Sequence, residues 1–321
     1  MKMRFLTIFI LIVCLLNSSA CAYPTTPDAN ASPAPKAANP IVIAGPATPS
    51  SIPLILAAEK MGNATVQIYQ NNAQANTSFL RGEITILVSG LSVGVDMRGN
   101  DVPVQVLNSY VTGLSYLVTH GEALDSLSDL NGGEVYLPFE GSPIEEATLF
   151  LAQQEGLTWG VDIKPVYSPF DASVVLLKEG KAKAVVLPEP FVSLVENEPS
   201  LFISLDYFER WNTLTGTYTG YPQVGSFANS AWAAQNPDQV AEFNAALEDS
   251  IRFIQENPEE AVVRVKDTFN LPEAVLLRSL ARTHFSLLAG DALQASVNEY
   301  YQWIGKPLDD KYTEFYYSPK K

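Results

Sequence analysis

The sequence predicts an α/β protein with two mainly parallel sheets flanked by helices. From Ile41 to about residue 200, short apolar strands alternate with helices, and this alternation is typical of parallel sheets covered by helices. About 280 residues follow Pro40, which is near the size at which one core gives way to two. We therefore expect two α/β units within one chain.

Composition and charge exclude several function classes. The chain has 321 residues, with 20 basic and 35 acidic side chains, a net charge of −15 and 47% hydrophobic residues. Such a chain is globular, and its acidity disfavours binding to nucleic acid. Both cysteines, Cys14 and Cys21, lie near the start, so the body has no disulfide, thiolate nucleophile or Cys-based metal site. With only His120 and His284, we expect no metal site, cofactor or catalytic residues.

The first residues resemble a bacterial lipoprotein signal. A basic start (Lys2, Arg4) precedes the apolar run Phe5–Leu16, and small residues lead to Cys21. We expect a lipoprotein-type signal peptide over residues 1–20 and lipidation at Cys21. The alternative is a short membrane anchor, although the apolar run is shorter than the roughly 20 residues that span a bilayer.

Residues 21–40 are predicted to be a Pro/Ala-rich tether. They hold little apolar surface to bury, so we expect an extended segment rather than part of the core. A lipid, a tether and a globular body together suggest a domain anchored outside the cytoplasm of a bacterium, either at the cell membrane or in the periplasm.

The elements follow from apolar runs, capping residues and turn residues. Strands are expected at Ile41–Ala44, Val66–Tyr69, Ile84–Ser89, Val102–Asn108, Leu114–Val118, Glu134–Leu137, around Val166, at Ala184–Leu187 and at Gln223–Phe227. Helices are expected from Ser50 or Ser51 to Lys60, at Asn76–Arg81, from Ser142 to Glu155, and at Asp171–Glu179 and Glu189–Glu196. Residues 207–222, rich in Thr, Gly and Tyr, are predicted to be a long functional loop. Everything after Phe227 is predicted to be helical, with His284 at a helix end.

Six short motifs follow one another along the body of the chain: Leu127-Ser-Asp-Leu-Asn-Gly-Gly-Glu-Val135, Pro138-Phe-Glu-Gly-Ser142, Gly156-Leu157, Leu176-Leu-Lys-Glu-Gly-Lys-Ala-Lys-Ala184, Leu187-Pro-Glu-Pro190 and Asn236-Pro237. In their order and spacing they are similar to those of the periplasmic solute-binding proteins of ABC transporters. The branch they resemble binds sulfonates, nitrate, taurine or thiamine-type pyrimidines.

This resemblance implies a two-lobed periplasmic-binding-protein fold (type II), with the ligand cleft between the lobes. Lobe one would comprise 41–112 plus 223–321, and lobe two 113–222. The crossing strands would fall near Thr112–Ser115 and Tyr218–Gln223. The resemblance also implies a monomer whose two lobes close on a small molecule. An ABC permease would then recognise the closed conformation.

Topology selects the candidate binding residues. In open parallel sheets, ligands lie beyond the carboxyl ends of the strands, where helices begin and offer free N–H groups. The selected loops contain no Lys or Arg but several aromatic rings, which favours a small heteroaromatic ligand that stacks on them. For each serine the alternative is a plain helix cap, and for each ring it is packing between lobes. The candidates are Ser50, Ser51, Ser89, Tyr110, Phe139, Gly141, Ser142, Phe170, Glu189, Tyr218 and Tyr221.

Three functions remain open on the sequence alone. The first is a tethered binding protein that delivers a ligand such as a pyrimidine-type vitamin precursor or a flavin to an import permease, with sulfonate, taurine or nitrate as the alternative ligand. The second is an enzyme on the same fold, similar to a chorismate dehydratase or a pyrimidine synthase. The third is a lipoprotein that presents the same cleft to a receptor.

Overall fold

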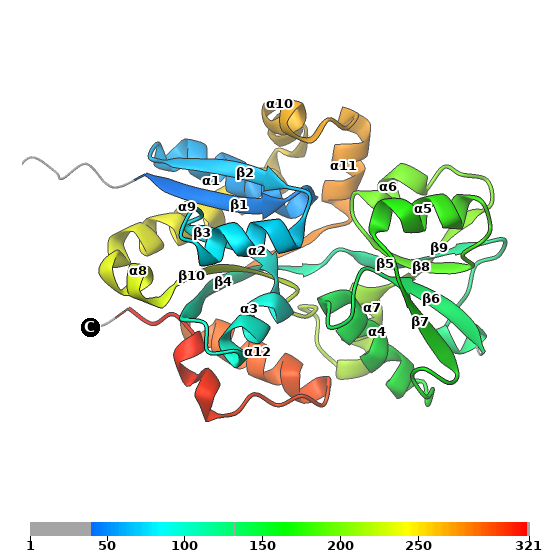
Figure 1. The fold of residues 1–321 in the computed structure, drawn as a ribbon. Coiled ribbons are helices and arrows are strands. Elements are labelled where there is room, and N and C mark those ends of the chain that lie inside the picture. The colour runs from blue at the N-terminus through cyan, green and yellow to red at the C-terminus, as the bar shows by residue number, and fades with distance from the viewer. Residues whose placement is uncertain (1–39, 131, 320–321) are drawn as a thin grey trace, which may run out of the picture. The chain divides into compact units, whose positions relative to one another are not determined.

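Two sheets organise residues 40–130 and 132–319, which are the residues that the computed structural model describes (Figure 1). The six-stranded sheet has the order β11-β4-β10-β3-β1-β2, and the five-stranded sheet has the order β7-β6-β8-β5-β9. The predicted signal segment 1–20, Cys21 and all of the tether except Pro40 lie outside the described residues.

The six-stranded sheet contains the strands nearest each end of the described chain. Its strands are β1 (Ile41–Pro46), β2 (Ala64–Tyr69), β3 (Ile86–Gly90), β4 (Val104–Gly113), β10 (Val224–Asn229) and β11 (His284–Leu288). The helices beside it are α1 (Ile52–Met61), α2 (Asn72–Leu80), α3 (Leu91–Gly99), α8 (Ser230–Gln235), α9 (Pro237–Glu256), α10 (Pro258–Phe269), α11 (Glu273–Ala281) and α12 (Gly290–Trp303). The short 3₁₀ turns η1 (Pro49–Ser51) and η3 (Asp310–Phe315) complete this part.

Side chains on the two faces of this sheet join different cores. Ile43 and Val88 pack with α1 and α9, whereas their neighbours Ala44 and Leu87 pack with α3 and α12. This alternation follows from the period of two along a strand. A sheet covered on both faces explains why β1 and the start of β3 are continuous apolar runs in the sequence.

The five-stranded sheet is built from the middle of the chain. Its strands are β5 (Ser115–His120), β6 (Gly133–Leu137), β7 (Ile163–Tyr167), β8 (Ala184–Pro188) and β9 (Leu201–Asp206). The 3₁₀ turn η2 (Leu127–Leu130) and the helices α4 (Pro143–Gln154), α5 (Phe170–Lys178), α6 (Phe191–Val195) and α7 (Tyr207–Thr215) accompany it. Leu177 of α5 and Val192 of α6 pack on one face, and Phe150 of α4 and Trp211 of α7 pack on the other.

The predicted α/β class with two sheets flanked by helices is confirmed, but both sheets are mixed rather than mainly parallel. β1 pairs parallel with β2 and β3, and β6 pairs parallel with β7 and β8, as expected for strand–helix–strand units. β10 runs antiparallel to β3 and β4, and β5 runs antiparallel to β8 and β9. The antiparallel strands β4, β5 and β10 adjoin the points where the chain passes between the sheets.

Two short passages connect the sheets. The chain leaves the first sheet after Gly113 and enters the second at Ser115, and it returns after α7 through residues 216–223. The passages are joined by hydrogen bonds from Tyr221 N to Thr112 O (3.2 Å) and from Gln223 N to Val111 O (2.9 Å). The assignment of 41–112 plus 223–321 and of 113–222 to two lobes stays a prediction.

Two expected features differ in the structure. Residues 207–222 are not one long loop, because Tyr207–Thr215 form α7. The carboxylate of Asp206 caps this helix by accepting from Phe208 N (2.8 Å) and Glu209 N, and Tyr207 and Trp211 bury one face of it. The end of the chain is not all helical either, because His284–Leu288 pair with β4 as β11, so that tertiary pairing decides the structure of this short segment.

Within residues 40–130 and 132–319, no helix has the length and apolar character needed to cross a bilayer.

Candidate functional site

A cavity of about 110 Å³ lies where helices begin after strands of both sheets. The first sheet contributes residues that follow β1, β2 and β3, namely Thr48, Ser50, Asn72 and Val93, together with the strand ends Pro46, Tyr69, Ser89 and Gly90. The second sheet contributes Pro138, Phe139, Ser142, Pro143, Ile144, Phe170 and Pro188. Leu114, Gln223 and Val224 come from the passages and the start of β10.

This location follows from the topology. The carboxyl ends of parallel strands meet at one edge of each sheet, and the helix that follows each strand begins there. Ser142 illustrates the local cause: its hydroxyl accepts from Glu145 N (3.1 Å), and Pro143 occupies the first helical position, so the sequence starts α4 at the cavity.

The polar side chains of the cavity are held by specific partners. Thr48 Oγ1 and Ser50 Oγ lie 2.7 Å apart, and Tyr69 donates its hydroxyl proton to Val88 O (2.8 Å). Burial raises the pKa of Tyr69 to about 12, although its hydrogen bond with Ser89 acts in the opposite direction. Tyr69 therefore stays neutral at physiological pH.

No Lys, Arg, Asp or Glu of the described chain lines the cavity. Positive potential comes instead from the helix starts. α3 and α5 begin directly after Gly90 and Pro169, and neither has a side-chain cap, although Leu91 N of α3 donates to Gln223 O (3.0 Å). The site therefore combines uncharged side chains with two helix starts that lack side-chain caps.

Three aromatic side chains line the cavity. Phe139 is 38% exposed, Phe170 is partly buried and in contact with Phe191 (ring centroids 5.2 Å apart), and Tyr69 is partly buried on the opposite sheet. These rings can pack against the two faces or the edge of a flat solute.

The structure brings five of the sequence-predicted site residues to this cavity and places the other six elsewhere. Ser50, Ser89, Phe139, Ser142 and Phe170 line it. Ser51, Tyr110, Gly141, Glu189, Tyr218 and Tyr221 do not. Whether the five bind a ligand stays a prediction.

The residues outside the lining have other surroundings. Ser51 donates to Pro46 O, and Tyr110 is fully buried in β4 and donates to Ser50 O (2.7 Å), which places it behind the cavity wall. Gly141 N donates to the Glu145 carboxylate. Tyr218 is 90% exposed, and Tyr221 is buried against Trp211 and Tyr300.

Glu189 is part of an ion-pair cluster rather than of the cavity wall. It is fully buried, accepts from Ser193 Oγ (3.1 Å) and Ser193 N (3.2 Å), and lies 3.5 Å from Arg282 Nη1. Burial raises the pKa of its carboxyl, while Ser193 and Arg282 act in the opposite direction. Its partners make it a link between α6 and the end of α11.

Sequence reasoning missed Gln223. It lines the cavity from the passage that returns to the first sheet, and it is 4% exposed. A lone glutamine belongs to no motif, so residue type gave no signal. Its place at the end of the predicted crossing Tyr218–Gln223 was the one indication available.

Neither histidine lines the cavity. His284 begins β11 and stacks on Phe208 with ring centroids 3.6 Å apart, and burial lowers its pKa. Among the residues that the structure describes, no group of three His, Cys, Asp or Glu side chains could hold a metal ion.

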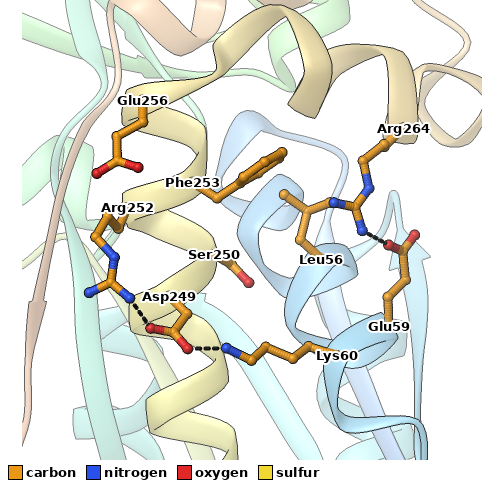
Figure 2. Close-up of a pocket in the computed structure, with 9 residues that line it drawn as sticks. All are labelled: Leu56, Glu59, Lys60, Asp249, Ser250, Arg252, Phe253, Glu256 and Arg264. Carbon is orange, nitrogen blue, oxygen red and sulfur yellow. Dashed lines mark hydrogen bonds and ion pairs between the residues drawn. The ribbon is translucent and has the colours of Figure 1, made fainter.

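A larger hollow of about 540 Å³ lies elsewhere, between α1, α9 and α10. Figure 2 shows the Asp249 carboxylate between Lys60 and Arg252, and Arg264 directed at Glu59. These pairs are solvent-exposed, and Lys60 lowers the pKa of Asp249. Because its charges already neutralise one another at the surface, we interpret this hollow as a solvated surface between helices.

Glu146 of α4 bridges to the end of α12. Its carboxylate accepts from Lys306 Nζ (3.1 Å) and Tyr300 OH (3.2 Å). Burial raises its pKa above the ordinary value of 4.5, although Lys306 opposes the shift. Between pH 4.5 and the raised pKa, the folded chain binds the Glu146 proton more tightly than the unfolded chain does. The contribution of the Glu146 carboxyl to stability therefore falls as the pH rises through this window.

We expect the Glu146→Gln variant to lose less stability than the wild type as the pH is raised from 4.5 through this window, because Gln cannot titrate. Urea unfolding midpoints measured across pH 4.5–8 check this. Parallel curves for the two proteins would show that the pKa of Glu146 is the same in the folded and unfolded chains.

Comparisons with known proteins agree with this architecture of two sheets around a shared cavity, which is that of the periplasmic binding proteins. The family model described as NMT1/THI5 like matches residues 48–261, more than half of the chain, and the chain belongs to this family. No curated protein sequence matched the chain.

Solved structures with the same fold include three sulfonate-binding proteins. The periplasmic aliphatic sulphonate-binding protein SsuA of Escherichia coli is 15% identical, with a TM-score of 0.72 over 88% of this chain and 94% of that chain. The alkanesulfonate-binding SsuA of Xanthomonas axonopodis pv. citri, bound to MOPS, is 16% identical, with a TM-score of 0.67 over 85% and 96%. The putative sulfonate-binding SsuA of Methylobacillus flagellatus KT is 21% identical, with a TM-score of 0.62 over 83% and 87%.

Proposed function

We propose that this chain is a membrane-tethered, extracytoplasmic solute-binding protein that delivers a small single-ring heteroaromatic compound to an ABC import permease. The observation that carries the proposal is the cavity at the carboxyl ends of strands from both sheets, lined by side chains of both. The lipoprotein-type signal, Cys21 and the tether support export and anchoring.

The volume of the cavity limits the size of the ligand that it can hold. An apolar cavity of roughly 150 Å³ in another protein holds one benzene molecule. A space of about 110 Å³ therefore suits one small ring at most, and a flavin would require the cavity to widen. The partly exposed Phe139 and the rings of Phe170 and Tyr69 supply surfaces for such a ring.

A sulfonate is the second candidate. The starts of α3 and α5 carry no side-chain cap, and free N–H groups at helix starts bind anionic oxygens. The sulfonate-binding proteins among the structural matches support this candidate. Against it stands the absence of any basic side chain in the described cavity lining.

A transport role without catalysis accords with the chemistry of the site. The described lining holds neither a histidine nor a carboxylate beside its hydroxyls, so no base is placed to activate Ser50, Ser89 or Ser142. An enzyme on this fold would need such a base. We therefore propose that binding and closure, rather than turnover, are the function.

The proposal predicts that a single-ring aminopyrimidine stabilises the protein and that Phe139→Ala weakens its binding about 2- to 10-fold, the loss expected for one ring contact. At 100 times the dissociation constant, a ligand stabilises by about 2.7 kcal/mol, which thermal unfolding detects. The measurement is a thermal-unfolding panel of aminopyrimidines, thiamine, riboflavin, taurine, alkanesulfonates and nitrate, followed by titration calorimetry.

Phe202 provides a matched control. It is 37% exposed, close to the 38% of Phe139, but it lies on β9 outside the cavity lining. Phe202→Ala should leave binding unchanged. Stabilisation by sulfonates or nitrate alone would replace the heteroaromatic ligand with the second candidate, and conversion of a bound compound to a product would replace transport with catalysis.

A further inference from the structure

Gln223 is fixed in place by its backbone. Its N–H donates to Val111 O (2.9 Å) in β4, and its carbonyl accepts from Leu91 N (3.0 Å) at the start of α3. The residue is therefore held between a strand end and a helix start, directly before β10, and it lines the cavity.

The side chain of Gln223 is only half satisfied. Nε2 donates to Ser115 Oγ (2.7 Å), and Ser115 is itself buried at the start of β5. Oε1 is buried and has no hydrogen-bond partner. Among the described residues that line the cavity, it is the one buried side-chain polar atom left in this state.

Other polar groups around the cavity show the contrast. Thr48 and Ser50 are paired with each other, and Ser142 Oγ caps α4. Buried polar groups in proteins are nearly always paired, and an unpaired one calls for an explanation. A lone acceptor in a solute-binding cavity is explained if the solute supplies the donor.

We infer that Gln223 is a specificity-determining residue, and that its Oε1 accepts a hydrogen bond from an N–H or O–H group of the solute. This inference rests on the proposed function, because it uses the same cavity. It narrows the ligand class to compounds that place a donor on the ring or chain that enters the site. Ser115 acts as a positioning residue, since it holds the other end of the amide.

Matched ligand pairs test the donor requirement without any mutation. The pairs are 4-aminopyrimidine against 4-methylpyrimidine, and taurine against propane-1-sulfonate, in which a methyl group replaces the amine. For the pair that binds, we expect the amine member to bind roughly 10- to 100-fold more tightly in calorimetry, because the methyl member leaves Oε1 unpaired.

Variants then assign the effect to Gln223. Gln223→Met keeps the length of the side chain without the amide, so the preference for the amine member should fall to about 2-fold or less. Gln235→Met, at an exposed position in α8 outside the cavity, is the matched control and should keep the full preference. Ser115→Ala leaves Gln223 in place and should reduce the preference partly.

The outcomes separate this inference from the proposed function. Equal binding of both members of a pair, or tighter binding of the methyl member, overturns the donor requirement and leaves the solute-binding function intact. A preference that survives Gln223→Met overturns the role of this residue. A panel in which no compound of either class binds overturns the proposed ligand classes and this inference with them.

Discussion

Replacing Arg282 with Ala should destabilise the protein by about 3 kcal/mol, because it leaves the buried Glu189 carboxylate without its cation, whereas Glu196 keeps its ion pair with Arg278. The Arg282 guanidinium pairs with Glu196 and lies 3.5 Å from the fully buried Glu189, and it donates to Ser193 Oγ (3.0 Å). Once it is removed, the Glu189 carboxylate keeps its hydrogen bonds from Ser193 and Ser279 but loses the cation beside it. Urea unfolding at pH 7 measures the loss.

The effect should depend on pH in a defined direction. Burial already raises the pKa of Glu189, and removing Arg282 takes away one of the groups that oppose this shift. The variant should therefore recover part of its stability as the pH falls and the carboxyl takes up a proton. Adding Glu189→Gln to Arg282→Ala should restore part of the stability at pH 7.

Arg252 is the matched control. It pairs with Asp249 at the surface, with 60% of its side chain exposed, so Arg252→Ala should cost about 1 kcal/mol or less. If Arg282→Ala were equally mild and insensitive to pH, water would reach Glu189 in the native state, and the link between α6 and α11 would contribute little to stability.

The sequence was sufficient to place five of the eighteen residues that line the cavity, because the argument needed only topology. Ser50 and Ser142 each follow a strand and precede or begin a helix, Ser89 lies at the end of β3 just before α3, and parallel strands bring such positions together. Phe139 and Phe170 lie in the same kind of junction. No knowledge of side-chain packing was required for these five.

The remaining candidates depended on packing, which a single sequence does not reveal. Tyr110 and Tyr221 carry the same type of side chain as a ligand-stacking residue, but one lies within β4 and the other packs on Trp211. Glu189 follows a strand as a binding residue would, and its partner Arg282 is distant in sequence. Gln223 was missed because its importance depends on an unpaired atom.

The two elements that were predicted wrongly have a related cause. α7 forms because Asp206 caps it and because Trp211 finds a buried partner in Phe150, and the second condition is tertiary. The strand β11 forms because β4 extends to Gly113 and offers it an edge to pair with. Local propensity alone is weak evidence for such short segments.

Gly220→Ala should be the most damaging conservative change in the returning passage, at about 2–5 kcal/mol. Gly220 has a φ of +69°, and a Cβ there would lie 2.2 Å from Thr112 O and 2.5 Å from Phe208 Cδ2. The left-handed backbone alone costs an alanine about 1–2 kcal/mol. The overlap adds about 1–3 kcal/mol, because the Thr112 carbonyl is held by Tyr221 N and the Phe208 ring is stacked on His284.

Gly216 separates these two contributions. It has nearly the same φ, +71°, at the end of α7, but a Cβ there would meet nothing within 4 Å. Gly216→Ala should therefore cost only the backbone contribution of about 1–2 kcal/mol. The difference between the two variants in urea unfolding measures the close approach of the two passages.

Gly220→Ala should also weaken ligand binding, because the returning passage leads to the cavity. Thr112 O accepts from Tyr221 N (3.2 Å), so displacing this carbonyl disturbs the hydrogen bonds that hold the returning passage up to Gln223. Because Gln223 lines the cavity, Gly220→Ala should lower affinity for any compound that the wild type binds, whereas Gly216→Ala should not. The contrary result is that Gly220→Ala lowers stability and affinity no more than Gly216→Ala does. That result would mean that the two passages separate at little cost in free energy. The position of Gln223 would then have to be set by Leu91 and Ser115 alone.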